Sequence, residues 1–203
     1  MGHDHGRAGM TALDLKEDLH NYLRGGRETL VWKLDGLGEY DIRRPLTPTG
    51  TNLLGLVKHS AGTMFRYFGD VFDRTHDVSL PWLAGDAEPN AEFWAAPGET
   101  RDDIVTAYRR TWELADETIV ELPLDAAGRV PWWGGGTVTL FQVLVHVTAE
   151  TQRHAGHADV LRELIDDAAG LLEGHDNLPA SDPVWWSDHR DRVEAAARLA
   201  GGA

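Results

Sequence analysis

The stretch HVTAETQRHAGHADVLREL, residues 146–164, has the pattern of one helix, yet it carries three histidines and a glutamate where a buried helix would carry leucine. Measured from His146 at about 100° per residue, His157 lies at roughly 20°, Glu150 at roughly 40° and His154 at roughly 80°. One face of this helix therefore carries ionisable side chains over nearly three turns. Histidine and glutamate are also metal-ligating residue types, so the face is the first place to look for function.

Glu150 and His154 are four residues apart, so their side chains are neighbours on adjacent turns and can share one metal ion. The motif ETQRH is an E-x-x-x-H chelate, which differs from the H-E-x-x-H signature of zinc proteases. A catalytic zinc site typically has three protein ligands and one open position. His59, mid-helix in LLGLVKHSAG among apolar and small residues, is the best candidate for the third ligand. Two histidines and one carboxylate suit Zn²⁺, and Ni²⁺ or Fe²⁺ also accept them.

The same residues have a plainer interpretation. A lone histidine in a helix is often a hydrogen-bonded core residue, and an ionisable stripe is often a solvated face. The opposite side of the helix is not clearly more apolar, since it carries Leu140, Leu144, Val145, Ala149, Gln152 and Ala155. From the spacing alone, a metal site and a solvated face remain equally open.

Composition narrows the classes of protein. The 203 residues suit one compact domain, and 42% hydrophobic residues with eight tryptophans can form a substantial core. The formal net charge of −14 disfavours nucleic acid and anionic membranes as partners. The chain has no cysteine, which excludes a cysteine nucleophile and thiolate ligands and fits the cytoplasm. No apolar run approaches the roughly 20 residues of a membrane span, and the N-terminal MGHDHGRAGM lacks the apolar region of a signal peptide.

Four segments with helical periodicity predict an all-α protein, an antiparallel four-helix bundle with long crossover loops. They cover about residues 13–37, 51–72, 100–119 and 137–167, with predicted N-caps at Thr51, Thr100 and either Thr137 or Thr139. Gly25 and Gly26 interrupt the first segment, which weakens the prediction of one unbroken helix there.

The remaining segments complete the predicted organisation. Residues 75–99 are rich in proline, glycine and acidic residues, so we expect a long loop of the kind that is often functional. We divide the chain into a flexible leader (1–10), the bundle (11–170), and a C-terminal loop and short helix (171–203) that packs on the bundle.

At these residues the sequence resembles the DinB superfamily of DinB/YfiT-like metalloenzymes. It is most similar to the actinobacterial branch labelled mini-circle protein, which is linked to mycothiol-dependent transferases. The resemblance covers almost the whole chain, through RETLVWKLDGL, TNLLGLVKHSAG, YFGDVF, LPWLAGDAEPNAEFW, RVPWW and ETQRHAGHADVLREL. It implies a divalent metal at one end of the bundle, held by a histidine of the second helix and a pair on the fourth.

Those ligand positions match His59, Glu150 and His154. Many relatives have three histidines, and Glu150 in place of the first member of the pair resembles mycothiol-dependent maleylpyruvate isomerase. His146 and His157 lie outside this triad, and we interpret them as residues that line the pocket or support the ligands.

Three further residues are candidates for the pocket. Arg153 can contact a substrate carboxylate, or it can pair with a nearby acid such as Asp166 or Glu150. Trp132 and Trp133 lead into the histidine-bearing helix through RVPWWGGG, and they either close the end of the bundle or form an aromatic wall of the pocket.

A metal with an open position can bind a small thiol as thiolate, and a chain without cysteine must take its sulfur from such a molecule. Arginine greatly outnumbers lysine, a bias that favours mycothiol over other thiols. The resemblance thus implies a metal-dependent transferase that joins mycothiol to small electrophiles, most simply with zinc, in a homodimer. The alternatives are a metal-dependent hydrolase of a small molecule and a non-enzymatic, stress-related metal-binding bundle.

Overall fold

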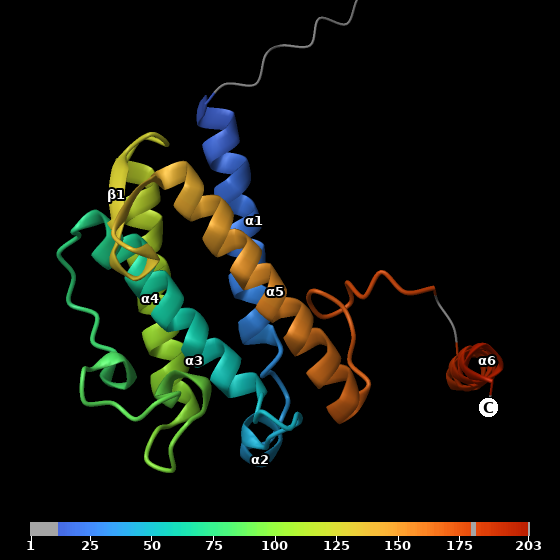
Figure 1. Cartoon of the computed structure of the whole chain (residues 1–203). Coiled ribbons are helices and arrows are strands. Elements are labelled where there is room, and N and C mark those ends of the chain that lie inside the picture. The colour runs from blue at the N-terminus through green and yellow to red at the C-terminus, as the bar shows by residue number, and fades with distance from the viewer. Residues whose placement is uncertain (1–11, 180–181, 203) are drawn as a thin grey trace, which may run out of the picture.

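The computed structural model describes residues 12–179 and 182–202, so the predicted leader 1–10 lies outside the described residues. Figure 1 shows long helices packed side by side, a small hairpin near one end, and a last helix that stands apart. The main elements, in chain order, are α1 (Ala12–Trp32), α2 (Glu39–Arg43), α3 (Leu53–Met64), α4 (Arg101–Glu121), β1 (Ala127–Val130), β2 (Gly136–Thr139), α5 (Leu140–Asp166) and α6 (Pro183–Gly201).

The mainly helical fold is as expected, but a two-stranded sheet was not. Strand β1 pairs antiparallel with β2, with Ala127 opposite Thr139 and Val130 opposite Gly136. Gly134 and Gly135 both have positive φ angles, 72° and 74°, in the connection between the strands. Because such angles strain residues with a Cβ, the glycines of RVPWWGGG mark this turn.

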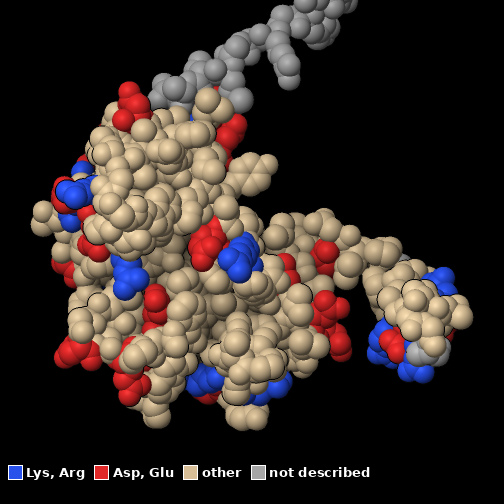
Figure 2. Space-filling model, viewed as in Figure 1, with Lys and Arg blue, Asp and Glu red and all other residues tan. Residues whose placement is uncertain are grey.

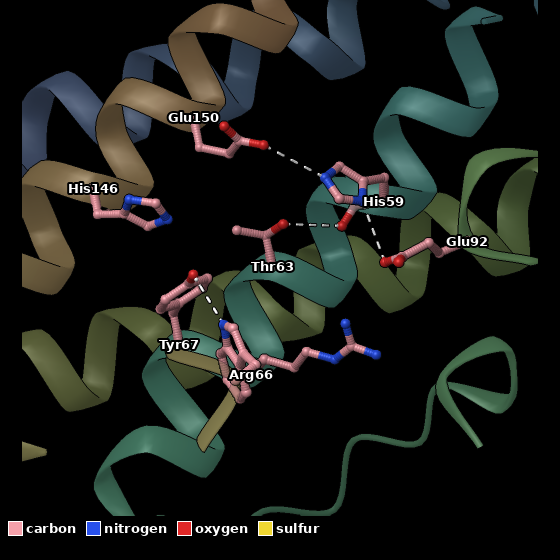
Figure 3. A pocket seen from close by; sticks show the side chains of 8 residues that line it. His59, Thr63, Arg66, Tyr67, Glu92, His146 and Glu150 are labelled. Atoms are coloured by element: carbon pink, nitrogen blue, oxygen red, sulfur yellow. Dashed lines mark hydrogen bonds and ion pairs between the residues drawn. The ribbon is translucent and has the colours of Figure 1, made fainter. Parts of the chain in front are cut away.

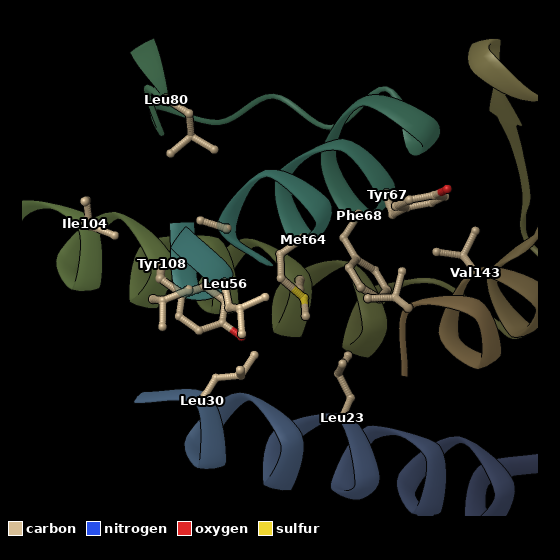
Figure 4. Close-up of a cluster of buried hydrophobic side chains, with 14 of the residues drawn as sticks. Leu23, Leu30, Leu56, Met64, Tyr67, Phe68, Leu80, Ile104, Tyr108 and Val143 are labelled. Carbon is tan, nitrogen blue, oxygen red and sulfur yellow. The ribbon is translucent and has the colours of Figure 1, made fainter. Parts of the chain in front are cut away.

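The four long helices α1, α3, α4 and α5, here called the helical body, enclose the core. Helix α1 packs mainly on α5, and α3 packs on both α4 and α5. Figure 4 shows Leu23 and Leu30 of α1 facing Met64, Phe68 and other apolar side chains across the interior. Burial of this apolar surface is the main force that holds the helices together.

Helix α1 runs unbroken through the glycine pair that weakened its prediction. A Cβ on Gly26 would lie 2.9 Å from the side chains of both Thr151 and Gln152 on α5. Gly26 therefore lets α1 and α5 approach closely, and this packing offsets the low helix propensity of glycine.

Local capping sets the helix starts. Thr100 and Thr139 accept hydrogen bonds from backbone N–H groups in their first turns, as predicted. The prediction of Thr51 as the cap of α3 was wrong, because Asn52 accepts the N–H of Gly55 instead. Asparagine is a stronger N-cap than threonine, and here it begins the helix that carries His59.

The C-terminal helix α6 is longer and less packed than expected. It has 19 residues, and none of its described residues is buried. Figures 1 and 2 show it apart from the helical body. Arginine and acidic side chains occupy much of α6, and they favour water over an apolar interface.

On the face drawn in Figure 2, acidic and basic side chains of the described residues are interspersed, without a broad basic area. Within residues 12–179 and 182–202, no helix has the length and apolar character needed to cross a membrane.

Candidate metal centre

Two helices bring three metal-capable side chains together. His59 comes from α3, and Glu150 and His154 come from adjacent turns of α5. The Nε2 atom of His59 lies 3.8 Å from Oε1 of Glu150, and Nε2 of His154 lies 3.0 Å from the same oxygen. One potential ligand atom from each residue lies within 4.8 Å of the others. We call these three residues the ligand cluster.

The donor set of the ligand cluster fits a divalent metal. Ligand atoms about 2.0–2.1 Å from a tetrahedral metal are roughly 3.4 Å apart, and the two separations from Glu150, 3.8 Å and 3.0 Å, are close to that value. His154 is buried, and its Nδ1 atom has no hydrogen-bond partner in the structure. The chemistry and spacing of the cluster therefore suit Zn²⁺, Ni²⁺ or Fe²⁺.

The surroundings favour the protonation states that a metal needs. Burial opposes the charged form of Glu150, but the charge and hydrogen bond of His154, with help from His59 and Arg153, bring the pKa of Glu150 below its usual value. Burial and the nearby charge of His59 lower the pKa of His154, against the opposing effect of Glu150. A charged carboxylate and a neutral imidazole are both ready to ligate near neutral pH.

A cavity of about 220 Å³ opens beside the ligand cluster. Figure 3 shows Glu150 and His59 on one side of it, with His146 and Tyr67 on the other. Its walls are formed by His59, Thr63, Arg66, Tyr67, Glu92, Trp132, His146 and Glu150. A space of this size holds a small molecule or the reactive end of a larger one.

Aromatic side chains form one wall of the cavity. The ring of Tyr67 lies 5.3 Å from Trp132 and 4.9 Å from His146, and Trp132 Nε1 donates to Tyr67 Oη. Trp133 packs edge-on against His146, with ring centres 4.7 Å apart. Trp132 therefore lines the cavity, whereas Trp133 contacts it only through His146.

Two of the other candidates lie at the surface. Arg153 is exposed, and it influences Glu150 through its charge rather than through a hydrogen bond. It does not pair with Asp166, which instead binds Arg162. His157 is exposed too, with its ring 5.4 Å from that of His154. Neither residue lines the cavity.

Some residues of the site were missed by the sequence analysis. Arg66 and Tyr67 follow His59 by seven and eight residues, a helical spacing that could have placed them on the same face. They lie in a π-helical turn, Phe65–Gly69, of the kind often found at functional sites. Glu92 comes from the loop at 75–99, where no local pattern distinguishes it from the other acidic residues.

A helical protein with histidines and a glutamate converging from facing helices has the architecture of helical metal-binding proteins. The sequence model of the mycothiol-S-transferase family matches residues 18–167, and the chain belongs to this family. The matched region contains the whole helical body apart from the first turns of α1, and it contains the ligand cluster. No curated protein matches the chain.

Proposed function

We propose that this protein is a metal-dependent S-transferase that joins mycothiol to small electrophilic molecules. The observation that carries the proposal is the convergence of His59, Glu150 and His154 beside a cavity in a member of the mycothiol-S-transferase family. The absence of cysteine from the chain also supports the proposal, because the nucleophilic sulfur must then come from a bound thiol.

A divalent metal, most simply zinc, supplies a Lewis acid that lowers the pKa of a thiol. The two imidazoles of the ligand cluster leave the metal with a net positive charge, and Glu150 reduces that charge by one. His146 lines the same cavity, so its imidazole can accept the proton that the thiol releases. Sulfur then bonds to the electrophilic carbon, and the leaving group departs with its electron pair.

The aromatic wall and Arg66 would orient the electrophile. Tyr67 and Trp132 offer flat apolar surfaces, and Arg66 offers a half-buried cation at the same cavity. Because the cavity measures only about 220 Å³, the bulk of a thiol such as mycothiol would lie outside it. The enzyme would thus hold the reactive ends of both substrates and leave their remote parts near the surface.

The test is a panel of thiols assayed with and without a chelator, using a halogenated aromatic electrophile. Consumption of the electrophile should require both metal and thiol, and mycothiol should outperform glutathione because the thiol must be positioned as well as ionised. Elemental analysis should find about one divalent metal per chain. The rate should rise with pH until the thiol is fully deprotonated.

Two results would redirect the proposal. Turnover that needs the metal but is indifferent to thiol would identify a hydrolase that uses water as nucleophile. Metal binding without turnover of any electrophile in the panel would support the non-enzymatic metal-binding protein.

We further propose that the helical body is an antiparallel four-helix bundle of the DinB type. We also propose that the protein is cytoplasmic and that two copies of it form a homodimer. Large apolar side chains remain exposed along α5, namely Phe141, Val145, Val160 and Leu164. Pairing of two chains would remove such a surface from water. Light scattering should give twice the chain mass at micromolar concentration, and a strict monomer would refute the dimer.

A further inference from the structure

A short piece of the 75–99 loop holds the imidazole of His59 from two directions. In the 3-10 turn Ala91–Phe93, Oε2 of Glu92 lies 3.2 Å from Nδ1 of His59. The ring of Phe93 stacks on that of His59, with centres 4.4 Å apart and planes within 18° of parallel. The hydrogen bond and the stacking together restrict both the rotation and the tilt of the ring.

The hydrogen bond also selects the tautomer of His59. Glu92 is half-buried, and its Oε2 atom is within hydrogen-bond distance of Nδ1 of His59. An ionised carboxylate only accepts hydrogen bonds, so Nδ1 of His59 must be the donor. The lone pair on Nε2 is then free on the opposite side of the ring. Figure 3 shows that this side faces Glu150.

Contacts with α3 hold this part of the loop in the position from which it orients the ring of His59. A Cβ on Gly55 would clash with the carbonyl oxygen of Phe93, so the backbone of the loop touches the helix at a glycine. Asn52 donates to the same carbonyl oxygen, and buried Lys58 donates to the carbonyl oxygen of Trp94. These contacts come from the N-terminal half of α3, before His59 and on the same helix.

A salt bridge completes the attachment. Nζ of Lys58 lies 2.7 Å from Oε2 of Glu99, and the same carboxylate oxygen accepts the N–H of Ala96. A buried ammonium with a charged partner and a carbonyl partner resists displacement, because moving the loop would leave it without either. Segment 91–99 is therefore a fixed part of the site wall.

From this geometry we infer that Glu92 is a positioning residue for His59, and that the contact of segment 91–99 with Gly55 holds it in place. The inference rests on the proposed role of His59 as a metal ligand. Glu92 itself does not ligate the same metal as Nε2 of His59, because it lies on the Nδ1 side of the ring. Carboxylates that orient a ligand histidine in this way typically contribute ten- to a hundredfold to metal affinity, an order-of-magnitude expectation.

The first experiment measures Co²⁺ affinity by titration, following the visible absorption of the bound ion. Glu92→Ala should weaken binding about ten- to a hundredfold and change the absorption band, since the ring of His59 loses its orientation. Glu92→Gln, whose amide oxygen can still accept from Nδ1, should recover most of the loss. The control is Glu88→Ala, which removes the same charge from an exposed position in the same loop and should change affinity less than about twofold.

The second experiment reads the tautomer in metal-free protein by ¹⁵N NMR of the histidine rings, with the His59 signals assigned from a His59→Asn variant. In the wild type, His59 should carry its proton on Nδ1. In Glu92→Ala, the proton should move to Nε2, the form that a free neutral imidazole prefers. A Glu92→Ala protein that keeps both the Nδ1 tautomer and wild-type Co²⁺ affinity would overturn the inference.

The third experiment moves the loop without touching the site. Gly55→Ala should push Phe93 outward and weaken Co²⁺ binding at least about tenfold, whereas Gly85→Ala, where an added Cβ meets nothing within 4 Å, should not. Circular dichroism of the metal-free variants checks that each one folds. Wild-type affinity in a folded Gly55→Ala protein would overturn the role of this contact. Failure of the wild type to bind metal would instead defeat the proposed function, so the two failures are distinguishable.

Discussion

Two groups of ionisable side chains lie along α5, and they are built differently. Toward the C-terminal end, Nζ of buried Lys33 lies 2.7 Å from Asp159 and 2.6 Å from the carbonyl oxygen of Gly170. Nearby, Arg162 makes two hydrogen bonds to Asp166. We call Lys33, Asp159, Arg162 and Asp166 the paired cluster, because each cation in it has an anion as its partner. Together with the bond from Lys33 to Gly170, these contacts join the end of α1, α5 and the loop that follows α5.

The ligand cluster, in the middle of the same helix, is organised in the opposite way. His59, Glu150 and His154 bring one potential ligand atom each to within 4.8 Å of the others, and Nε2 of His154 donates to Glu150 inside the cluster. No arginine or lysine among the described residues makes an ion pair with any of the three. Cations paired with anions stabilise a fold, whereas metal-ligating groups that converge beside a cavity form a candidate functional site. We therefore interpret the paired cluster as structural, and the ligand cluster remains the proposed functional site.

The largest expected effect separates the two clusters directly. His154→Ala should weaken Co²⁺ or Zn²⁺ binding more than about a hundredfold, because losing a ligand costs more than losing a residue that supports one. The free energy of unfolding of the metal-free protein should fall by only about 1 kcal/mol, the typical net contribution of the one hydrogen bond that is lost, from Nε2 of His154 to Glu150. Calorimetric titration and urea unfolding measure the two quantities, and His59→Ala should behave alike. Full metal affinity in either variant would show that the ligand cluster is misassigned.

The converse variant is Lys33→Met in the paired cluster. It should lower the free energy of unfolding by about 2 kcal/mol, less than for a fully buried pair because Asp159 stays partly in water. Metal affinity should stay within about twofold of the wild type. Arg190→Met on α6, where the arginine is 78% exposed, serves as the control and should change stability by less than about 0.5 kcal/mol. A parallel loss of metal affinity in Lys33→Met would mean that the two clusters are coupled.

A smaller effect is expected from Glu150→Gln. The amide oxygen can still ligate, so metal affinity should fall by about tenfold and less than in the histidine variants. Isothermal titration with the same metal measures the ranking. If Glu150→Gln lost more affinity than His154→Ala, the carboxylate would be the dominant ligand.

The smallest expected effect is a difference between the two clusters in the pH range over which each stops stabilising the folded protein. His154 has a folded pKa below its ordinary 6.5, so the folded state binds fewer protons and stability falls as pH drops below about 6.5. The hydrogen bond from Arg162 lowers the pKa of Asp166 below 3.8, so its contribution is lost only at more acidic pH. Urea unfolding of metal-free protein between about pH 4 and 8 measures this. His154→Gln should remove the slope near pH 6, and Asp166→Asn should leave it.

Local sequence patterns were sufficient for the helices and for the face of α5. The spacing of Glu150 and His154 predicted their contact, and the position of His59 among apolar and small residues made it the candidate third ligand, which the family resemblance then matched. The C-terminal helix was also foreseen, but its length and exposure were not, because amphipathic spacing does not say which surface is available. The hairpin before α5 was missed because its strands have four residues each, too few for alternation to be distinct.

What the sequence by itself determined is the composition of each helix face, since helical geometry is local and the same spacing gives the same face in any protein. Only the tertiary structure decided which charges are paired and which are left to bind a ligand. Lys33 meets Asp159, and Glu92 meets His59, across separations along the chain that no short pattern spans. These contacts depend on packing such as that of Gly55 against Phe93, where backbone shape, and not residue type alone, places one segment on another.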